Sequence, residues 1–256
     1  MSEAARRAEY LEALGIDDWV LRSAQPCAAT VPVAPEPGPV EPTGPVVSAP
    51  PQPAGEAGVP EAWEQLRAQV RACTACALHE TRTQAVFGVG NRRAEWMVIG
   101  EAPGAEEDRR GEPFVGHAGQ LLDAMLRAIG LSRETNVYIA NILKSRPPGN
   151  RDPRPEEVAA CLPYLHRQIA LVRPKLLLAV GRIAAQTLLG TDAPLGRLRG
   201  RAHAFGEHNV PLVVTYHPAY LLRSPGEKRK AWEDLQFARN LFAQIRNPEP
   251  NDGHRS

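Results

Sequence analysis

The sequence predicts an α/β fold of three layers, with helices on both faces of a small, mostly parallel sheet of four strands. Short apolar runs, which are typical of buried strands, alternate along the chain with longer segments whose apolar residues recur at helical spacing. Such alternation is typical of parallel strands that are connected by helices. Proline and glycine residues also stand at the expected ends of several helices.

The expected elements follow one another in a regular order. The strands are expected at residues 96–100, 137–143, 176–181 and 212–216. The helices are expected at residues 61–72, 118–129, 155–172, 182–189 and 228–245. Pro155 suits the first turn of its helix, and Glu156 and Glu157 place negative charge near the positive end of the helix dipole. Gly130 and Gly190 stand where two other helices end.

The chain divides into a main domain and flanking segments. Residues 1–22 are expected to form a short helix, because apolar residues recur there at roughly helical spacing. Residues 23–59 are rich in Pro, Ala, Gly and Val, the composition of an extended, flexible linker. The main domain is expected at residues 60–248 and a tail at residues 249–256. The N-terminal helix is a candidate for docking on the main domain or on an unidentified protein partner.

The composition excludes some classes of protein. The net charge of +1 excludes a strongly basic nucleic-acid binder, so DNA contact would depend on local basic clusters at residues 144–154, 197–201 and 223–230. Each cluster could also be an ordinary solvated surface. No apolar run reaches membrane-spanning length, and the N-terminus lacks a signal-peptide core. We therefore expect a cytoplasmic protein without a membrane partner, and a monomer.

Four segments carry most of the chemistry. They are GEAPGAEEDRRGEPFVGHAGQLLD at residues 100–123, NILKSRPPGNR at residues 141–151, the single Cys161, and HPAYLLRSP at residues 217–225. The first and the last each follow an apolar strand, so their turns are expected at one edge of the sheet, where ligands of open α/β sheets bind. In these segments the chain resembles the family 4 uracil-DNA glycosylases, the iron–sulfur-containing bacterial and archaeal branch of the uracil-DNA glycosylase superfamily. The resemblance extends from about Trp63 to about Ile245.

The resemblance implies a base-excision repair enzyme that flips uracil out of single- or double-stranded DNA and hydrolyses its N-glycosidic bond, leaving an abasic site. Two residues are implied to be catalytic. Glu101 would position the hydrolytic water or stabilise the cationic sugar of an oxocarbenium-like transition state. His217 would donate a hydrogen bond to uracil O2 as the bond breaks, which stabilises the departing uracil anion.

Five residues are implied to bind the base. Gly100 and Ala102 belong to a Gly/Pro turn whose backbone can approach a ligand closely. Glu107 would lie near the uracil C5 edge and help to exclude a methyl group, and Phe114 would be the stacking platform. The amide of Asn141 would pair with O4 and N3–H and reject cytosine. For Phe114 and Asn141 the alternative is an ordinary core residue.

The resemblance also implies a DNA-contacting surface. Leu221, Leu222 and Arg223 would enter the minor groove, fill the gap left by the base and contact phosphate, with the choice of the wedging leucine left open. Lys144 and Arg146, in the basic loop after the Asn141 strand, are further candidates for DNA contact.

The cysteines indicate a metal site with an unusual ligand set. Cys73 and Cys76 have the CxxC spacing that lets two thiolates bind one metal centre, and Cys161 is the third ligand that the resemblance implies. The fourth ligand is expected sixteen positions before Cys161, where this chain has Ser145. The resemblance thus implies a [4Fe-4S] cluster that has lost a usual ligand. Serine oxygen, water, Cys27 or His79 could complete the cluster, or the site could hold a three-iron cluster, zinc or no metal.

Two other functions compete with this interpretation. One is a product-trapping branch of the same superfamily, which uses a histidine in the loop after the Asn strand, and residues 146–151 contain no histidine. The other is a DNA-binding or polymerase-associated module that has kept the fold and lost the chemistry. The joint presence of Glu101, Phe114, Asn141 and His217 argues against such a loss. His117 stands where the family commonly has arginine.

Overall fold

The computed structural model describes residues 59–247 of the chain. The helix expected at residues 1–22, nearly all of the expected linker and the expected tail lie outside these residues. Within the described part of the chain, no helix has the length and apolar character needed to cross a membrane.

The domain is built on one mixed sheet of six strands in the order β1-β3-β2-β4-β6-β5. The four central strands are parallel to one another: β3 (Val137–Asn141), β2 (Trp96–Gly100), β4 (Leu176–Val180) and β6 (Val210–Thr215). An antiparallel strand lies at each edge, β1 (Val89–Gly90) beside β3 and β5 (Ala202–Phe205) beside β6. The parallel core is as predicted, but the expected total of four strands is wrong.

The two edge strands lack the signal by which the central strands were predicted. The central strands β2, β3 and β4 are buried at every position, and each is a continuous apolar run apart from Asn141 at the end of β3. The strand β1 has only two residues. In β5, Ala202 and Ala204 are exposed, whereas His203 and Phe205 are half-buried. Neither segment is long or apolar enough for its sequence to distinguish a strand from a loop.

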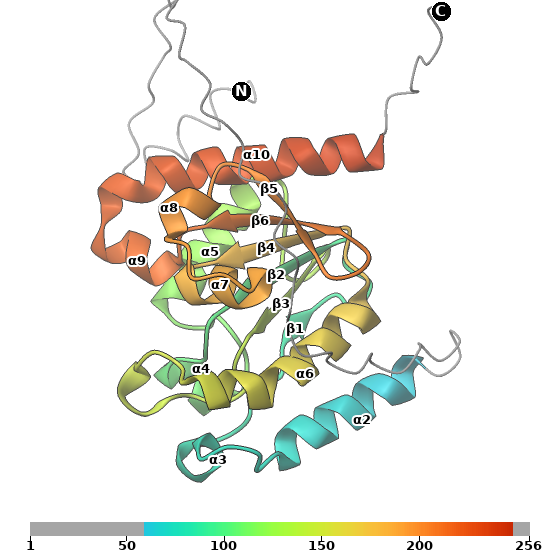
Figure 1. Cartoon of the computed structure of the whole chain (residues 1–256), viewed down its shortest axis with the longest axis vertical. Helices are drawn as coiled ribbons and strands as arrows, with labels where there is room; N and C mark the ends of the chain where they lie inside the picture. The colour runs from blue at the N-terminus through green and yellow to red at the C-terminus, as the bar shows by residue number, and fades with distance from the viewer. Residues whose placement is uncertain (1–58, 248–256) are drawn as a thin grey trace, which may run out of the picture. The chain divides into compact units, whose positions relative to one another are not determined.

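Helices cover both faces of the sheet, which confirms the three layers (Figure 1). One core cluster joins the sheet to α2 (Val59–Ala72), α6 (Pro155–Val172) and α7 (Arg182–Leu189). The other joins it to α5 (His117–Ala128), α9 (Pro218–Arg223) and α10 (Lys228–Arg246). The long helices therefore agree with the prediction to within about two residues at each end.

The predicted helix ends have the expected local chemistry. In α6 Pro155 occupies the first turn, and the carboxylate of Glu157 accepts a hydrogen bond from the Arg154 backbone N–H at 2.8 Å. Gly190 ends α7 in the left-handed conformation with φ of 60°, and Gly130 follows α5 with φ of 81°.

The short helices were not predicted, because one or two turns are too few to show a helical period. They are α3 (Leu78–Thr81), α4 (Ala105–Arg110), α8 (Leu195–Leu198), α9, and the 3₁₀ turns Pro148–Asn150 and Pro225–Glu227. The acidic segment around Glu106 therefore lies in a short helix.

The sheet brings the motifs together at the carboxyl ends of its parallel strands, which is the edge of the sheet that was predicted to bind a ligand. Gly100 at the end of β2 lies opposite Asn141 at the end of β3, and Thr215 at the end of β6 lies opposite Val180 of β4. Because these strands are parallel, their carboxyl ends meet at the same edge. His217 is the second residue after β6 and so lies at the same ends of the strands.

Candidate active site

An aromatic ring and an amide meet at the carboxyl ends of β2 and β3, and the place where Gly100, Phe114 and Asn141 meet is called the recess from here on. Phe114 and Asn141 are both buried, with exposed fractions of 6% and 2%. A Cβ atom added at Gly100 would lie 2.5 Å from Asn141 Oδ1 and 2.6 Å from Phe114 Cζ, so this position must be glycine. Phe114 itself has φ of 55°, a left-handed backbone that is uncommon for a bulky residue and often found at ligand sites.

The amide of Asn141 has an unused acceptor. Its Oδ1 atom is buried and has no hydrogen-bond partner among the described residues. Leaving a buried polar atom unpaired typically costs about 1 to 3 kcal/mol, so such atoms call for an explanation. A ligand that donates a hydrogen bond from within the recess would satisfy this atom.

His217 is held as a neutral imidazole with its Nε2 atom free to donate. It is the N-cap residue of α9, and its Nδ1 atom accepts a hydrogen bond from the Ala219 backbone N–H at 3.1 Å. Since Nδ1 is an acceptor, the ring proton belongs on Nε2. Burial lowers the pKa of His217 to about 4, and the positive charge of Arg223 contributes to the fall. The His217 and Phe114 rings are 5.6 Å apart between centroids.

Glu101 follows β2 and is half-buried at the same edge. Burial raises its pKa to about 7, the nearby carboxylate of Asp152 adds to the rise, and Arg182 opposes it. Arg182 donates to Asp152 at 2.8 Å. Sequence reasoning did not single out Asp152 or Arg182. The available signal was that Arg182 begins the helix after β4, whose carboxyl end lies at this edge.

Glu107 organises the loops around the recess. Its carboxylate accepts hydrogen bonds from the backbone N–H groups of Gly104 at 3.1 Å, Val115 at 3.0 Å and Gly116 at 3.1 Å. These bonds tie the start of α4 to the segment that carries Phe114. Ala102 lies half-buried in the turn between β2 and α4.

One of the leucines expected to contact DNA is inside the domain. Leu221 is 1% exposed and belongs to the second core cluster, so it offers no surface to DNA in this structure. Leu222, by contrast, is 46% exposed, and Arg223 is exposed beside it. The expectation for Leu221 is therefore corrected, because the helix α9 turns this side chain into the core.

Lys144 is also buried, which corrects its assignment as a DNA contact. Its Nζ atom donates to the Asn141 carbonyl oxygen at 2.8 Å and to Gln168 Oε1 at 2.6 Å. Burial lowers its pKa to about 7. Lys144 thus supports the strand end that carries Asn141. Arg146 remains half-buried at the surface, with its Nε atom 2.7 Å from Asn150 Oδ1.

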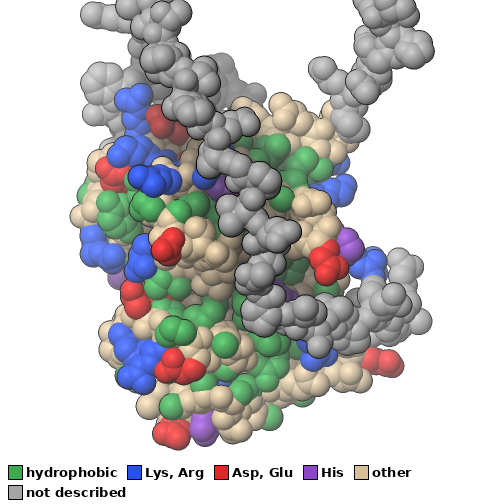
Figure 2. Space-filling view, viewed as in Figure 1, with side chains coloured by type: hydrophobic (Ala, Val, Ile, Leu, Met, Phe, Trp, Pro, Cys, Tyr) green, Lys and Arg blue, Asp and Glu red, His purple; other side chains and the backbone are tan. Residues whose placement is uncertain are grey.

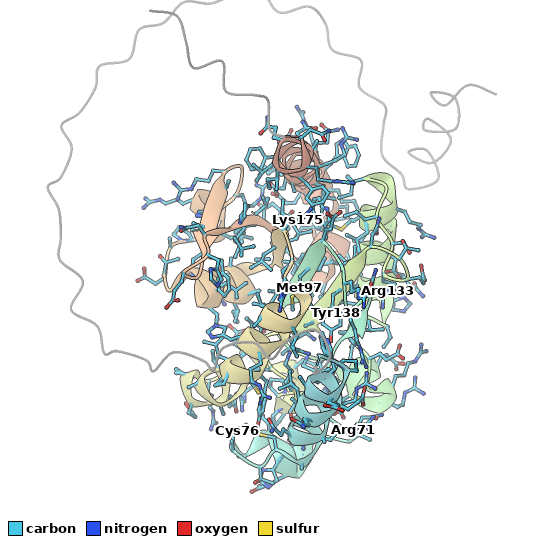
Figure 3. All side chains as sticks on the ribbon, turned by 90° about the vertical axis from the view of Figure 1, so that its right-hand side faces the viewer. Arg71, Cys76, Met97, Arg133, Tyr138 and Lys175 are labelled. Carbon is cyan, nitrogen blue, oxygen red and sulfur yellow. The ribbon has the colours of Figure 1, made fainter. Side chains whose placement is uncertain are left out.

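The cysteines and Ser145 line one hollow, although three separate segments carry them. Cys73 and Cys76 lie between α2 and α3, Cys161 lies in α6, and Ser145 follows β3. Figure 3 labels Cys76 at the same end of the domain as Arg71, far from Lys175. His79 lines the same hollow. Cys27, another residue considered for this site, lies outside the described residues.

Arg82 fills the space next to Ser145. Its guanidinium donates to Ser145 Oγ at 3.0 Å, to the Cys73 carbonyl at 3.1 Å and to the Arg71 carbonyl at 2.7 Å. The serine hydroxyl thus already has a partner, and the cation links both sides of the hollow.

The residue types around the hollow supply three of the four thiolates that a [4Fe-4S] cluster takes. Over residues 59–247, no group of three or more His, Cys, Asp or Glu side chains is arranged to hold a metal ion. A [4Fe-4S] cluster takes four thiolates, one for each iron. Three thiols and one hydroxyl face the hollow here. Burial raises the pKa of the Cys161 thiol, so a metal would have to displace its proton.

Comparison with known proteins adds independent evidence. Residues 87–236 match the family described as the uracil-DNA glycosylase superfamily. A type-4 uracil-DNA glycosylase of Archaeoglobus fulgidus is 44% identical over 69% of this chain and 91% of its own length. A relative with the same description from Pyrobaculum aerophilum is 43% identical over 67% of this chain and 90% of its own length. Another, from Thermotoga maritima, is 41% identical over 71% of this chain and 95% of its own length.

The similarity covers the sheet, both layers of helices and the recess at the sheet edge, and it extends over nearly the full length of these relatives. This chain therefore belongs to the type-4 uracil-DNA glycosylases of the uracil-DNA glycosylase superfamily.

Proposed function

We propose that this chain removes uracil from DNA by hydrolysing the N-glycosidic bond between base and deoxyribose, leaving an abasic site. The observation that carries the proposal is the buried, unpaired Oδ1 atom of Asn141, which lies beside Phe114 in a recess at the carboxyl edge of the sheet. Membership of the family supports uracil-containing DNA as the substrate.

Base recognition is assigned to Asn141 and Phe114. Uracil N3–H is a donor and would satisfy Asn141 Oδ1, while the amide NH₂ would donate to uracil O4. Cytosine presents an acceptor at N3 and a donor at C4, so it would leave the amide mismatched. The Phe114 ring supplies a stacking surface, and base stacking on an aromatic typically contributes about 1 to 3 kcal/mol.

Departure of the base is assigned to His217. Its Nε2–H would donate to uracil O2 and stabilise the negative charge that develops as the bond breaks. The hydrogen bond from the Ala219 N–H supports this role, because it keeps the proton on Nε2. A pKa of about 4 supports a neutral donor across the physiological range.

The sugar side of the reaction is assigned to Glu101. As a carboxylate it would orient the attacking water or stabilise the positive charge on the sugar. With a pKa of about 7, a substantial fraction of Glu101 is ionised at neutral pH. Glu107 is assigned to shaping the recess, since its carboxylate orders the loop that carries Phe114.

The DNA-contacting surface is assigned to Leu222, Arg223 and Arg146. The exposure of Leu222 on α9, the helix that His217 caps, supports assigning this leucine to the gap left by a flipped base. The two arginines would contact phosphate. Action as a monomer on single- or double-stranded DNA is part of the proposal.

The hollow lined by cysteines is assigned to an iron–sulfur cluster. Cys73, Cys76 and Cys161 would be its thiolate ligands, with Ser145 at the fourth corner. When bound, the cluster would supply a structural link between α6 and the segments that follow α2 and β3; hydrolysis of the glycosidic bond transfers no electrons. Arg82 would face this corner, since it already donates to Ser145 Oγ.

The proposal is tested by uracil release from oligonucleotides carrying one uracil, as a U:G duplex and as a single strand. The full-length protein is expected to release uracil from at least one of them. Asn141→Asp is expected to lower this rate and to allow release of cytosine, because a protonated carboxyl can donate to cytosine N3. Asn209→Asp makes the same chemical change in an exposed turn and is expected to behave like the wild type. Full retention of uracil in both substrates, beside an active control glycosylase, would contradict the proposal.

A further inference from the structure

Among the residues that the structure describes, two large apolar side chains are exposed, and both lie on α9. Tyr220 is 37% exposed and Leu222 is 46% exposed. A side chain of this kind on a helix that begins at a candidate catalytic residue calls for an explanation. For Leu222 the proposed function supplies this explanation, because its side chain would fill the gap left by a flipped base. Tyr220 has no role in the chemistry proposed so far.

Tyr220 cannot share the role of Leu222. Successive residues of an α-helix are about 100° apart around its axis, so residues two positions apart point about 200° apart. Leu221, between them, is buried in the core and fixes the rotation of the helix. Tyr220 and Leu222 therefore project on different sides of α9, and Tyr220 faces a different part of any bound DNA.

Tyr220 is the exposed member of a stack of flat groups. Its ring stacks on Tyr216 with centroids 5.1 Å apart and planes 23° apart. The guanidinium of Arg199 lies 4.3 Å from the centre of the Tyr216 ring. Arg199 is itself fixed, because it donates to Asp234 at 2.7 Å and to the Lys230 carbonyl at 2.6 Å. The stack holds Tyr220 in a defined orientation with part of its ring open to solvent.

Basic side chains are numerous on the surface around this stack. Figure 2 shows Lys and Arg side chains gathered on the side of the molecule where Figure 1 places α8, α9 and the start of α10. The exposed basic residues of these segments and of the chain just after α8 are Arg197, Arg201, Arg223, Arg229 and Lys230. Two of them are paired with carboxylates, Arg229 with Glu233 and Lys230 with Glu227. An exposed aromatic ring among cations is the combination by which proteins hold single-stranded nucleic acid, with the base on the ring and the phosphate near the charges.

We infer that Tyr220 is a stacking platform for an unpaired nucleobase next to the flipped uridine. His217 lies directly after Tyr216 in the chain and caps α9, so the platform adjoins the recess for uracil. In a single strand the neighbouring base is free to stack on Tyr220, whereas in a duplex it is held by its own partner. This inference rests on the proposed function, and it adds a second base-binding subsite that favours uracil in single-stranded DNA.

The test is a double-mutant cycle in which the Tyr220 ring and the neighbouring base are removed separately and together, and DNA binding is measured in each case. The probe is a single-stranded oligonucleotide that carries one 2′-fluorinated uridine resistant to hydrolysis, flanked by thymines. Two further probes replace the 5′ or the 3′ thymine by an abasic tetrahydrofuran residue. Full-length wild type, Tyr220→Ala and Tyr220→Phe are compared by fluorescence anisotropy, and uracil release from the cleavable counterparts is measured in parallel.

Tyr220→Ala is expected to weaken binding of the thymine-flanked strand about tenfold, as loss of one base stack typically does, and Tyr220→Phe is expected to restore it. With the abasic residue on the stacking side, wild type and Tyr220→Ala are expected to bind alike. An equal loss on all three strands, or no loss on any, overturns the inference. A wild type that binds the probes but releases no uracil contradicts the proposed function, while the binding cycle still decides the role of Tyr220.

Discussion

At the scale of single residues, burial acts on Glu101 and His217 in opposite directions. Loss of water disfavours the charged form of any group, so the pKa of the carboxyl rises and the pKa of the imidazole falls. The pKa of Glu101 is about 7 and that of His217 is about 4. At pH values well above 4 His217 is neutral and can act as a hydrogen-bond donor, while Glu101 still changes its charge near pH 7. Glu101 can therefore set the dependence of the rate on pH.

Uracil release is therefore expected to depend on one ionisation between pH 5 and pH 9. Below pH about 7 Glu101 becomes protonated and loses the negative charge assigned to it, so kcat/KM should fall about tenfold for each pH unit. Above pH about 7 the rate should be constant, since His217 is already neutral. The measurement is kcat/KM on a single-stranded substrate across this range. Glu101→Gln should be slow and independent of pH; a slope that persists in this variant would assign the ionisation to another group.

The glycine at the end of β2 gives a second prediction at this scale. Gly100→Ala would place a Cβ atom 2.5 Å from Asn141 Oδ1 and 2.6 Å from the Phe114 ring, so both base-binding groups must move. A displacement of about 1 Å typically costs about 100-fold in rate, and we expect a loss of this size in kcat/KM. Gly196→Ala is the matched control, because nothing lies within 4 Å of a Cβ there. Equal rates for the two variants would show that the recess is not where uracil binds.

At the scale of elements, the helix α9 buries the side chain of Leu221 and exposes that of its neighbour Leu222, so the two leucines are expected to have different roles. Leu221→Ala removes a buried side chain, so we expect a loss of about 2 to 5 kcal/mol in the free energy of unfolding. Leu222→Ala changes an exposed side chain and should leave stability within about 0.5 kcal/mol. Leu222→Ala should instead slow release of uracil from a duplex more than from a single strand, because only the duplex has a gap to fill. Urea unfolding and uracil release from both substrates measure the two effects.

A loss of activity confined to Leu221→Ala, at a temperature where that variant is folded, would reverse the assignment of the wedge. Both variants alter one leucine of the same six-residue helix, so each serves as the control for the other.

The same contrast explains which elements the sequence alone could predict. The strands β2 and β4 are short but continuously apolar, and the helices α6 and α7 are longer periodic segments. Proline or glycine stands at one end of each, and the structure has all four within a residue of the prediction. The elements β1, β5 and α9 have two to six residues, which is too short for a helical period, and the two strands lack a continuous apolar run as well. Their form depends on neighbours that are distant in sequence.

The candidate site shows the same division. The sequence pattern predicts Gly100, Asn141 and His217 at one sheet edge, because parallel strands must end together. It does not predict that Lys144 points inward, since a lysine in a basic loop has the pattern of a surface residue. Only the packing of α6 against β3 reveals Gln168 as its partner.

At the scale of the whole molecule, the hollow lined by cysteines joins segments that the sheet does not connect. Its walls come from the chain after α2, the chain after β3 and the middle of α6. In this structure the network of Arg82 links the first two of these walls through Ser145 and two backbone carbonyls. An iron–sulfur cluster held by thiolates from the chain after α2 and from α6 would make a covalent link in addition to this network.

The serine at the fourth corner predicts a cluster that is easily damaged. A neutral hydroxyl is a weaker iron ligand than a thiolate, so wild-type protein purified without oxygen should hold iron and sulfide but lose iron on exposure to air. Ser145→Cys supplies the missing thiolate, close to the positive charge of Arg82, and should retain about four irons and four sulfides per chain after the same exposure. Ser132→Cys is the control, since it adds a thiol in a loop remote from the hollow. Iron and acid-labile sulfide are measured before and after air exposure, with the visible absorption of the cluster recorded in parallel. Iron in Ser145→Cys but none in anaerobic wild type would mean that the serine abolishes the cluster, and no iron in either would mean that the three cysteines do not bind one.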